Sequence, residues 1–568
     1  MGRRSCRLRG LSGGGARHSQ SAGRPRLRAP ARARLHAVEV RPLRPDGSAE
    51  GRSGLASHRA QNPGGLGRSS RIATMRKTVA ILGIPIDDLD SAQALQRLEQ
   101  FVESGRFHQV ATANTDFLIK AHADPELKSI LLAADMVVPD GMPIVLASRW
   151  LRAGLRERVA GADLVPGLAG LAAKRGWRLY MLGARPEVAQ AARRRLEEDC
   201  PGLQIVGCLS PPVASILEMD NEAILADVER TAPHVLLVAF GNPKQEKWIH
   251  MHRGRLRVPV CMGVGGTFDF LAGAAPRAPL WMQRAGLEWL HRLANDPRRL
   301  WRRYATDLVH FARFLAVQLW SLRGWGTGEE ARIAHVRAGD ATVISVSGFL
   351  GVQALGELQL AAEKALEAPT HIVLDLHAAT GVDSSVLGTL LNLPKRARHV
   401  GREVRLAGAS RRVIRALRTA CADDLLRVAP TFTDALTAAP ESAFDVRALV
   451  NGTAAVLQLC GRAAGERWQE VEAAAAAIPP SIRALCLDLR SVGYVDSGML
   501  AALARLEAGQ RSRSCAVTLA PSPEVRRALL REGAAHLFTL VDSPCHPVPV
   551  SDEAADSVAV PEVAAHEA

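Results

Sequence analysis

Six polar or glycine-rich clusters follow apolar runs between residues 112 and 304. They read, in order, Thr-Ala-Asn-Thr-Asp (112–116), Pro-Asp-Gly (139–141), Glu-Arg-Val-Ala-Gly-Ala-Asp (157–163), Gly-Asn-Pro-Lys-Gln-Glu-Lys-Trp (241–248), Gly-Val-Gly-Gly-Thr-Phe-Asp (263–269) and Gly-Leu-Glu-Trp-Leu-His-Arg (286–292). An α/β domain places its chemistry in clusters of this kind, at the ends of strands. A carboxylate there can act as a general base, and arginines or backbone amides can hold a phosphate.

Asp140 is the candidate general base. It stands between Pro139 and Gly141, directly after the apolar run that begins at Met136, so we expect it at a strand end facing a cleft. Thr112 and Asn114 stand at another strand end, where short polar side chains can bind a substrate or orient the base. Because the same residue types are common in turns and helix caps, a purely structural role is the alternative for all three.

Arginines and glycines supply the positive and dipolar groups that a phosphate needs. Arg158 can bind phosphate or carboxylate through two parallel hydrogen bonds, and an exposed salt bridge is its alternative role. The Gly-Asn-Pro turn at 241–243 follows the apolar run 235–240 and would present backbone amides at the start of a helix. The glycines of 263–269 permit a close backbone approach to a phosphate.

A basic segment with interleaved tryptophans follows at residues 277–303. It contains seven arginines, three tryptophans and only two acids, which suits either a nucleic-acid groove or a membrane interface. Apolar residues recur at helical spacing from this segment onward, namely Trp301, Tyr304, Leu308, Phe311, Leu315 and Leu319. The spacing predicts an amphipathic helix able to lie on anionic lipid, and a helix packed on its own domain is the alternative.

Strands that alternate with helices must position these clusters. Short apolar runs occur at 79–83, 110–113, 136–139, 178–183, 203–207, 235–241 and 258–263. Helical patterns such as Pro186–Asp199 separate them. The alternation predicts an α/β domain with a Rossmann-like, mostly parallel sheet and helices on both faces.

The second half of the chain contains an internal repeat. Residues 331–437 and 444–545 each carry a strand, a loop, an Asp-Ser pair and an apolar helix, with the same spacing between their aspartates. We expect two small α/β domains that dock a partner. Because neither copy has a paired carboxylate or a phosphate loop, and a Gly-rich break at 324–328 precedes them, we expect them to be mechanically insulated and dispensable for chemistry.

Charge and cysteine content narrow the function classes. Residues 1–74 hold sixteen Arg, no Lys and three acids, so +13 of the formal charge of +15 belongs to this stretch. We expect this Arg-rich extension to be disordered, either a basic arm or the product of a start codon assigned upstream of Met75. The remaining net charge of +2 gives no sign of nucleic-acid binding, and a short acidic tail at 546–568 closes the chain.

The nine cysteines lack metal-site spacing. No apolar run reaches the roughly 18 residues of a membrane span.

The six ordered clusters resemble the WecG/TagA/CpsF family of bacterial glycosyltransferases, and the resemblance covers about residues 75–320 of a domain expected at 75–325. It implies that Asp140 is the catalytic base and that Thr112, Asn114, Arg158 and Gln245 bind substrate. It also implies that three further arginines bind the diphosphate, namely Arg292, Arg299 and Arg302. Family members commonly carry His-Gly-Tyr-Phe where this chain has Cys-Leu-Ser-Pro-Pro from residue 208, which leaves the donor and acceptor open.

The repeats resemble the STAS domain of anti-sigma-factor antagonists. In that family a partner kinase phosphorylates the serine at the corresponding helix start. The resemblance therefore implies a protein partner or kinase and phosphorylation of Ser384 and Ser497, where the helix dipole tolerates a phosphate. N-capping of the helix by these serines is the alternative.

The family resemblance also implies a reaction. The chain would move an N-acetylhexosamine, N-acetylmannosamine or a relative, from a UDP-sugar to a polyprenyl-diphosphate-linked sugar, with inversion and without a metal ion or other cofactor. The product would belong to a surface polysaccharide or wall polymer. Its partners would be these substrates, and it would lie peripherally on the inner face of the cytoplasmic membrane. No nucleic-acid partner is expected. The resemblance is compatible with a homo-oligomer. The alternative is an inactive, membrane-associated scaffold for partner switching by the repeats.

Overall fold

The computed structural model describes residues 77–275, 277–279, 281–282, 287–295, 297–322, 330–338, 341–420, 426–437 and 444–542. The expectations for the Arg-rich extension, the Gly-rich break and the acidic tail therefore concern residues outside this description.

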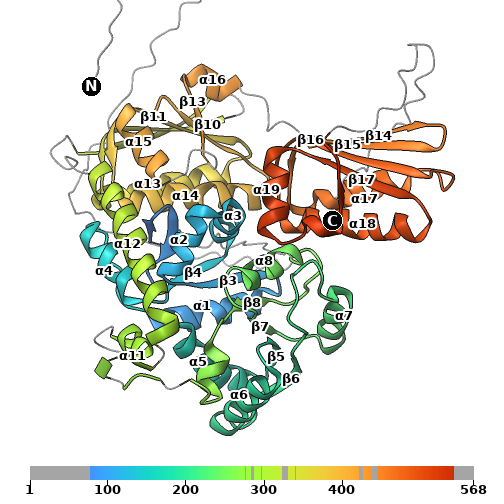
Figure 1. The fold of residues 1–568 in the computed structure, drawn as a ribbon. Helices are drawn as coiled ribbons and strands as arrows, with labels where there is room; N and C mark the ends of the chain where they lie inside the picture. The colour runs from blue at the N-terminus through green and yellow to red at the C-terminus, as the bar shows by residue number, and fades with distance from the viewer. Residues whose placement is uncertain are drawn as a thin grey trace, which may run out of the picture. The chain divides into compact units, whose positions relative to one another are not determined.

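A six-stranded parallel sheet forms the centre of the first domain (Figure 1). Its strands are β3 (His108–Ala113), β4 (Met136–Pro139), β5 (Arg178–Gly183), β6 (Gln204–Leu209), β7 (Val235–Ala239) and β8 (Val260–Gly263). They lie in the order β4-β3-β8-β7-β5-β6, and every neighbouring pair is parallel. The predicted α/β architecture with a parallel sheet is confirmed.

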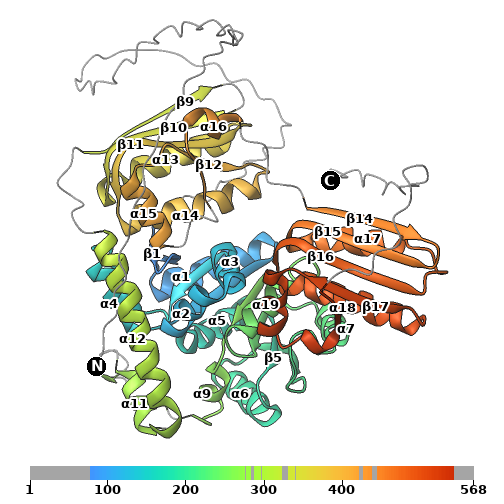
Figure 2. The same ribbon diagram turned by 45° about the horizontal axis from the view of Figure 1, so that its top comes forward.

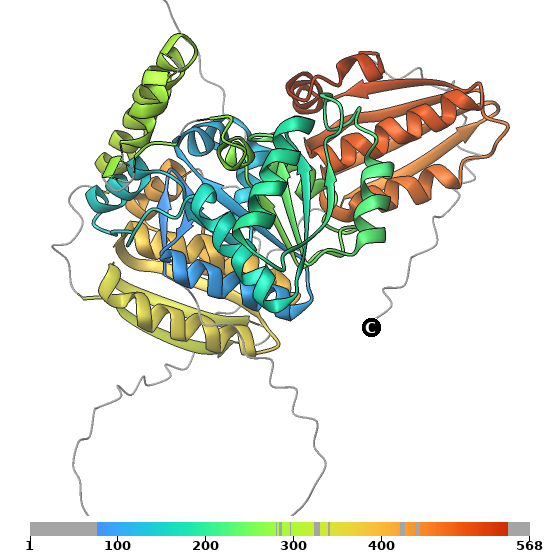
Figure 3. The ribbon, with the colours of Figure 1, turned by 90° about the horizontal axis from the view of Figure 1, so that it is seen from below.

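Helices cover both faces of this sheet (Figure 3). They are α1 (Ser91–Ser104), α2 (Thr115–Ala123), α3 (Pro125–Ala133), α4 (Met142–Trp150), α5 (Gly161–Arg175), α6 (Pro186–Asp199), α7 (Asn221–Thr231), α8 (Lys244–Met251) and α9 (Thr267–Leu271). Alternate residues of a strand enter different cores: Val235 and Leu237 of β7 pack with α1, α5 and α6, whereas Leu236 and Val238 pack with α7 and α8. Burial on both faces explains why this strand is apolar throughout.

The first apolar run does not join the parallel sheet. Strand β1 (Thr78–Ile81) instead pairs with β2 (Ile84–Asp87) in a separate antiparallel hairpin. The two turn residues, Leu82 and Gly83, have φ of 48° and 79°, the left-handed conformation that a two-residue hairpin turn requires. The chain therefore reverses after four residues, and the expectation of a parallel strand at 79–83 was wrong.

Two helices follow the first domain, α11 (Glu288–Asn295) and α12 (Pro297–Ser321). The packing alternative for the amphipathic pattern describes one face of α12, whereas binding of the exposed face to lipid stays a prediction. Phe311 and Leu315 are buried in the core that contains β1, β2 and α2, whereas Trp301 and Leu308 are 53% and 62% exposed. No helix in the described ranges has both the length and the hydropathy needed to cross a bilayer.

The two repeats fold alike, each around a five-stranded sheet (Figure 2). The first repeat contains β9 (Arg332–Ala338), β10 (Ala341–Leu350), β11 (His371–Val382), β12 (Val404–Ala407) and β13 (Arg427–Ala429), with η1 (Val352–Ala354), α13 (Leu355–Glu367), α14 (Ser384–His399), α15 (Arg411–Thr419) and α16 (Phe432–Thr437). The second contains β14 (Asp445–Asn451), β15 (Ala454–Ala463), β16 (Ala484–Val495), β17 (Ala516–Pro521) and β18 (Thr539–Leu540), with η2 (Gly465–Arg467), α17 (Trp468–Ala476), α18 (Ser497–Ser512), α19 (Pro523–Arg531) and η3 (Ala535–Leu537). Their central strands even share two register shifts at matching places.

Both repeats contact the first domain directly. Helix α14 lies against β1, and a Cβ atom at Gly388 would come within 2.7 Å of the Thr78 carbonyl oxygen. Asn392 Nδ2 also donates a hydrogen bond of 3.2 Å to Thr78 Oγ1. Helices α18 and α19 of the second repeat contact α3 and α8 through the polar residues described below. The expectation of mechanical insulation was therefore wrong, because buried surfaces join the domains whatever the composition of the intervening segment.

Candidate active site

Backbone hydrogen bonds bring the first three clusters together at the carboxyl ends of β3 and β4. The Asp140 amide donates to the Ala113 carbonyl oxygen at 2.7 Å, and the Val159 amide donates to the Pro139 carbonyl oxygen at 2.9 Å. The chain segments that carry Asn114, Asp140 and Arg158 therefore run side by side.

The fifth cluster reaches the same edge through α5 and α9. A Cβ atom at Gly161 would lie 3.3 Å from Thr112 Oγ1 and 3.4 Å from Thr267 Oγ1. Both threonines are buried. Gly161, the first residue of α5, therefore lets this helix start close against β3 and α9, where a larger residue would push the two threonines away.

Gln245 joins the two glycine-rich loops. Its Oε1 atom accepts hydrogen bonds from the Gly241 amide at 3.1 Å and the Gly265 amide at 3.0 Å. Its Nε2 atom donates to Glu246 Oε1 at 2.7 Å. Because Gln245 is only 1% exposed, this side chain holds the loops after β7 and β8 in fixed relation to each other.

Glu246 is a buried acid that the sequence pattern did not single out. Burial raises the pKa of its carboxyl group to about 8, which keeps it largely protonated at neutral pH. The Glu246 side chain leaves no room for a larger residue at Gly263. A Cβ atom at that position would lie 2.4 Å from Glu246 Oε1 and 2.5 Å from Gln245 Nε2. The only sequence signal was an acid beside Gln245 in the motif at 241–248.

Asn114 and Asp140 differ in their structural roles. Asn114 caps α2, because its Oδ1 atom accepts from the Phe117 amide at 3.1 Å. A contact with substrate would therefore use its Nδ2 amide group. Helix α4 begins after Gly141, which has no side chain to cap it, and the half-buried Asp140 precedes this glycine.

Arg158 lies in a cluster of ion pairs. Its Nη1 atom donates to Glu288 Oε2 at 3.0 Å and its Nη2 atom to Asp163 Oδ2 at 2.8 Å. Arg277 also pairs with Asp163. Arg158 therefore forms salt bridges, as the alternative interpretation expected, but its side chain is largely buried and not exposed. The contact with Glu288 connects α11 to the segment before α5.

The three other arginines lie on the following helices. Arg292 is in α11 and Arg299 in α12, and their side chains lie outside what the structure describes. Arg302 is exposed, with its guanidinium carbon 5.5 Å from the centroid of the Trp301 ring. Their convergence on a diphosphate stays a prediction. So does metal-independent chemistry, although no group of three or more His, Cys, Asp or Glu in the described part of the chain could hold a metal ion.

The two serines predicted as phosphorylation sites are the first residues of α14 and α18, and both are fully buried. The preceding aspartates cap these helices: Asp383 accepts from the Ser385 and Val386 amides, and Asp496 from the Met499 amide. Ser384 Oγ instead lies 3.4 Å from Gln318 Nε2 of α12, and Ser497 Oγ 2.9 Å from Glu126 Oε2 of α3. Modification of either serine would require its domain to leave this contact.

Family models divide the chain as the fold does. The model of the glycosyl transferase WecG/TagA/CpsF family matches residues 79–324. A STAS domain model matches residues 332–435, and a second one, described as a MlaB-type STAS domain, matches residues 449–541.

Curated relatives match the first domain. N-acetylglucosaminyldiphosphoundecaprenol N-acetyl-beta-D-mannosaminyltransferase of Bacillus subtilis is 30% identical over 228 residues, which is 40% of this chain and 87% of the relative. The protein of the same name from Bacillus spizizenii is 31% identical over 225 residues, covering 39% of this chain and 85% of the relative. The one from Staphylococcus aureus is 28% identical over 226 residues, covering 39% and 87%.

Proposed function

We propose that this chain, which belongs to the WecG/TagA/CpsF family of glycosyl transferases and carries two STAS domains, transfers an N-acetylhexosamine from a UDP-sugar to a polyprenyl-diphosphate-linked sugar. The names of the relatives support N-acetylmannosamine as the sugar and N-acetylglucosaminyldiphosphoundecaprenol as the acceptor. The observation that carries the proposal is the meeting of Asn114, Asp140 and the two loops bridged by Gln245 at one edge of the sheet.

Asp140 would act as the general base in a single displacement. The acceptor hydroxyl oxygen attacks the anomeric carbon and its proton passes to the Asp140 carboxylate, while the bond from that carbon to the diphosphate oxygen breaks and UDP leaves. Attack on the face opposite the leaving group inverts the anomeric configuration. A positioned base is what the hydroxyl needs, because a free alcohol is a weak nucleophile at neutral pH.

Arginines would neutralise the leaving diphosphate. Arg158 already presents its two guanidinium nitrogens to carboxylates, a geometry that phosphate oxygens can adopt equally well. Binding would then exchange Glu288 or Asp163 for a phosphate. Arg292, Arg299 and Arg302 are the further candidates, on the two helices that this ion pair ties to the domain.

An exposed apolar and basic surface supports work at a membrane. Trp301, Leu308 and Trp320 of α12 are all more than half exposed, and Arg302 and Arg313 lie exposed on the same helix. Trp281 and Trp289 add exposed rings just before it. Aromatic and basic side chains together favour the interface of an anionic bilayer, where the lipid-linked acceptor would be found.

Transfer can be measured as UDP release. We expect the full chain to release UDP from UDP-N-acetylmannosamine only when undecaprenyl-diphosphate-linked N-acetylglucosamine in anionic vesicles is added, and EDTA to leave the rate within about twofold. A requirement for Mg²⁺ or Mn²⁺ would overturn the arginine-based neutralisation. No release above the no-enzyme control would instead favour the inactive-scaffold alternative.

Gly263→Ala tests the loop bridge. The new methyl group would overlap Gln245 and Glu246, so Gln245 has to move and loses one of its two loop contacts. Losing a buried hydrogen bond costs about 1 kcal/mol. We therefore expect the donor KM to rise by about five- to tenfold, more than kcat falls. Gly170→Ala is the matched control, because the nearest atom to its Cβ would be Cys200 Sγ at 4.0 Å. An unchanged donor KM in Gly263→Ala would contradict a donor-binding role for these loops.

A further inference from the structure

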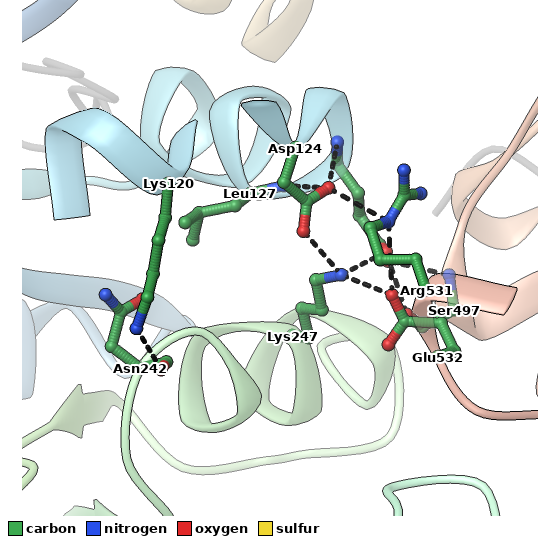
Figure 4. A network of polar contacts seen from close by, with 9 residues as sticks. Lys120, Asp124, Leu127, Asn242, Lys247, Ser497, Arg531 and Glu532 are labelled. Atoms are coloured by element: carbon green, nitrogen blue, oxygen red, sulfur yellow. Dashed lines mark hydrogen bonds and ion pairs between the residues drawn. The ribbon is translucent and has the colours of Figure 1, made fainter. Parts of the chain in front are cut away.

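A buried polar cluster joins the transferase domain to the second STAS domain (Figure 4). At its centre, Lys247 Nζ of α8 lies 2.7 Å from Asp124 Oδ2, 3.1 Å from Glu126 Oε2 and 2.5 Å from Glu532 Oε1. Glu532 directly follows α19 of the STAS domain, whereas Asp124 caps α3 of the transferase domain. One lysine thus holds carboxylates from both domains. We call this set, with Ser497 and Arg531, the Lys247 cluster.

Glu126 occupies the start of the STAS helix α18. Its Oε1 atom accepts from the Ser497 amide at 2.6 Å and its Oε2 atom from Ser497 Oγ at 2.9 Å. Arg531 Nε adds a contact of 3.4 Å to Asp124. A helix start favours an anion because its free amides and dipole point outward. The carboxylate of the transferase domain therefore fills the anion position of this helix.

The centre of the cluster is buried, so the stability of each charge depends on its pairing. Lys247, Glu126 and Glu532 are each at most 9% exposed at the side chain. Burial, together with the nearby charges of Glu532 and Asp496, raises the pKa of Glu126 to about 7, although Lys247 opposes this shift. Burial alone would lower the pKa of Lys247, but the surrounding carboxylates raise it, so the lysine stays charged. Each ion depends on its partners, since an unpaired buried charge is strongly unfavourable.

Helix α8 is also linked to the loops at Gly241 and Gly265, which are proposed above to bind the donor and which we call the donor loops. Lys247 is two residues after Gln245, whose side chain bridges the loops at Gly241 and Gly265. A second link runs through α2: Lys120 Nζ donates to the Asn242 carbonyl oxygen at 3.0 Å, and α2 leads directly to Asp124 (Figure 4). The Gly-Asn-Pro turn is therefore positioned by α8 and α2. The second STAS domain contacts Lys247 of α8 and Asp124, which follows α2.

The described contacts of the second STAS domain lie away from the candidate active site. Beyond Lys247 its contact runs toward the far end of α8, where a Cβ atom at Gly498 would lie 3.8 Å from Met251 Cγ and one at Gly254 would lie 3.3 Å from Glu466 Oε1. Asp140, Gly241 and Gly265 lie at the opposite end, at the carboxyl ends of the strands. Docking at this place therefore contacts α8 on the side away from the carboxyl ends of the strands.

We propose that the surface formed by α3 and α8 is a docking site for the chain's own second STAS domain, and that docking through the Lys247 cluster holds the donor loops in their binding arrangement. A negative charge placed at Ser497 competes with Glu126 for the start of α18 and releases the domain. Release loosens α8 and weakens donor binding. The kinetic part of this inference rests on the proposed transferase reaction, whereas the docking part does not.

Ser497→Asp in the full chain tests the docking site by hydrogen–deuterium exchange. The added carboxylate faces Glu126, so we expect faster amide exchange in peptides from α3 and α8 and a donor KM raised at least fivefold, with a smaller change in kcat. Adding Glu126→Gln to Ser497→Asp places an amide donor opposite the new carboxylate and is expected to restore both values toward wild type. Glu524→Gln on α19 is the matched control, because Glu524 forms an exposed ion pair with Arg527 of the same helix and should change neither readout.

The outcomes separate the two proposals. Unchanged exchange in α3 and α8 of Ser497→Asp would overturn docking through this cluster, and faster exchange with an unchanged donor KM would overturn its link to the donor loops. If the wild-type chain releases no UDP, the proposed function fails while the exchange data still decide the docking. Should Ser497→Asp prove misfolded by circular dichroism, Ser497→Ala, which removes only the hydroxyl contact, is expected to show a smaller exchange increase in the same peptides; its absence would overturn the docking site.

Discussion

Replacing Asp140 with asparagine is expected to slow sugar transfer by about 10²- to 10⁴-fold, the usual loss when a general base is removed. Asparagine keeps the size and shape of the side chain but cannot take the proton of the acceptor hydroxyl. The fold around it should persist, because the backbone amide of residue 140 still binds the Ala113 carbonyl oxygen. We therefore expect the loss in kcat, while the UDP-sugar Kd stays within about threefold of wild type.

Single-turnover transfer and donor titration measure these two quantities separately. Asp199→Asn is a suitable control, since Asp199 forms an exposed ion pair with Arg195 at the end of α6. Turnover near the wild-type rate in Asp140→Asn would remove Asp140 from the mechanism. A large rise in the donor Kd with little change in the single-turnover rate would reassign it to binding.

Strand and helix patterns predicted the fold where burial alone decides the structure. Strand β7 is apolar along its length because both of its faces are covered, and helix α6 was predicted with the bounds that the structure shows. The repeat was also visible, because the two copies keep the same aspartate spacing. The hairpin of β1 and β2 escaped prediction, since an apolar run of four residues fits an antiparallel strand as well as a parallel one and only the turn at Leu82 and Gly83 decides between them.

The candidate site was predicted as a set of segments, and its side-chain partners were not. Strand-end clusters predicted Asp140 and Asn114 as site residues, because the carboxyl ends of parallel strands share one edge. The family resemblance added Gln245, and the action of these residues on substrate stays a prediction. Nothing in the local pattern could show that Arg158 meets Glu288, which lies 130 residues away. Glu246 was missed for a related reason: its raised pKa comes from burial by distant segments, which sequence spacing does not report.

The contacts between domains are the largest departure from expectation. Ser384 and Ser497 were predicted to serve an external partner, yet both hydroxyls face the transferase half of the same chain. The composition of a linker predicts how stiff it is. It does not predict which surfaces the linked domains bury against each other. Lys247 shows such a contact, because its buried ammonium group pairs with Asp124 of the transferase domain and with Glu532 of the second STAS domain.

Lys247→Met is expected to weaken docking of the second STAS domain more than any other single change in the cluster. Methionine fills a similar volume but leaves Asp124, Glu126 and Glu532 without their shared cation, and breaking a buried ion pair in this way costs about 3–5 kcal/mol. Exchange in α3, α8 and the start of α18 should rise together by at least tenfold at pH 8. General unfolding of the transferase domain would instead raise exchange in β7 and β8 as well.

The loss in Lys247→Met should be smaller at low pH. The pKa of Glu126 is already about 7 in the docked chain, above its ordinary value of 4.5, and Lys247 is one of the groups that hold it down. Without the lysine this pKa rises further, so protonation of Glu126 stabilises the docked form below the pKa and the benefit disappears as the pH increases through it. We expect exchange in α3 and α8 of the variant to be slower at pH 6 than at pH 8 after correction for the intrinsic rates. Lys364→Met, at an exposed position of α13, is the control for loss of one positive charge. Exchange indistinguishable from wild type in Lys247→Met at pH 8 would mean that the hydrophobic contacts around the cluster, and not its charges, hold the domain in place.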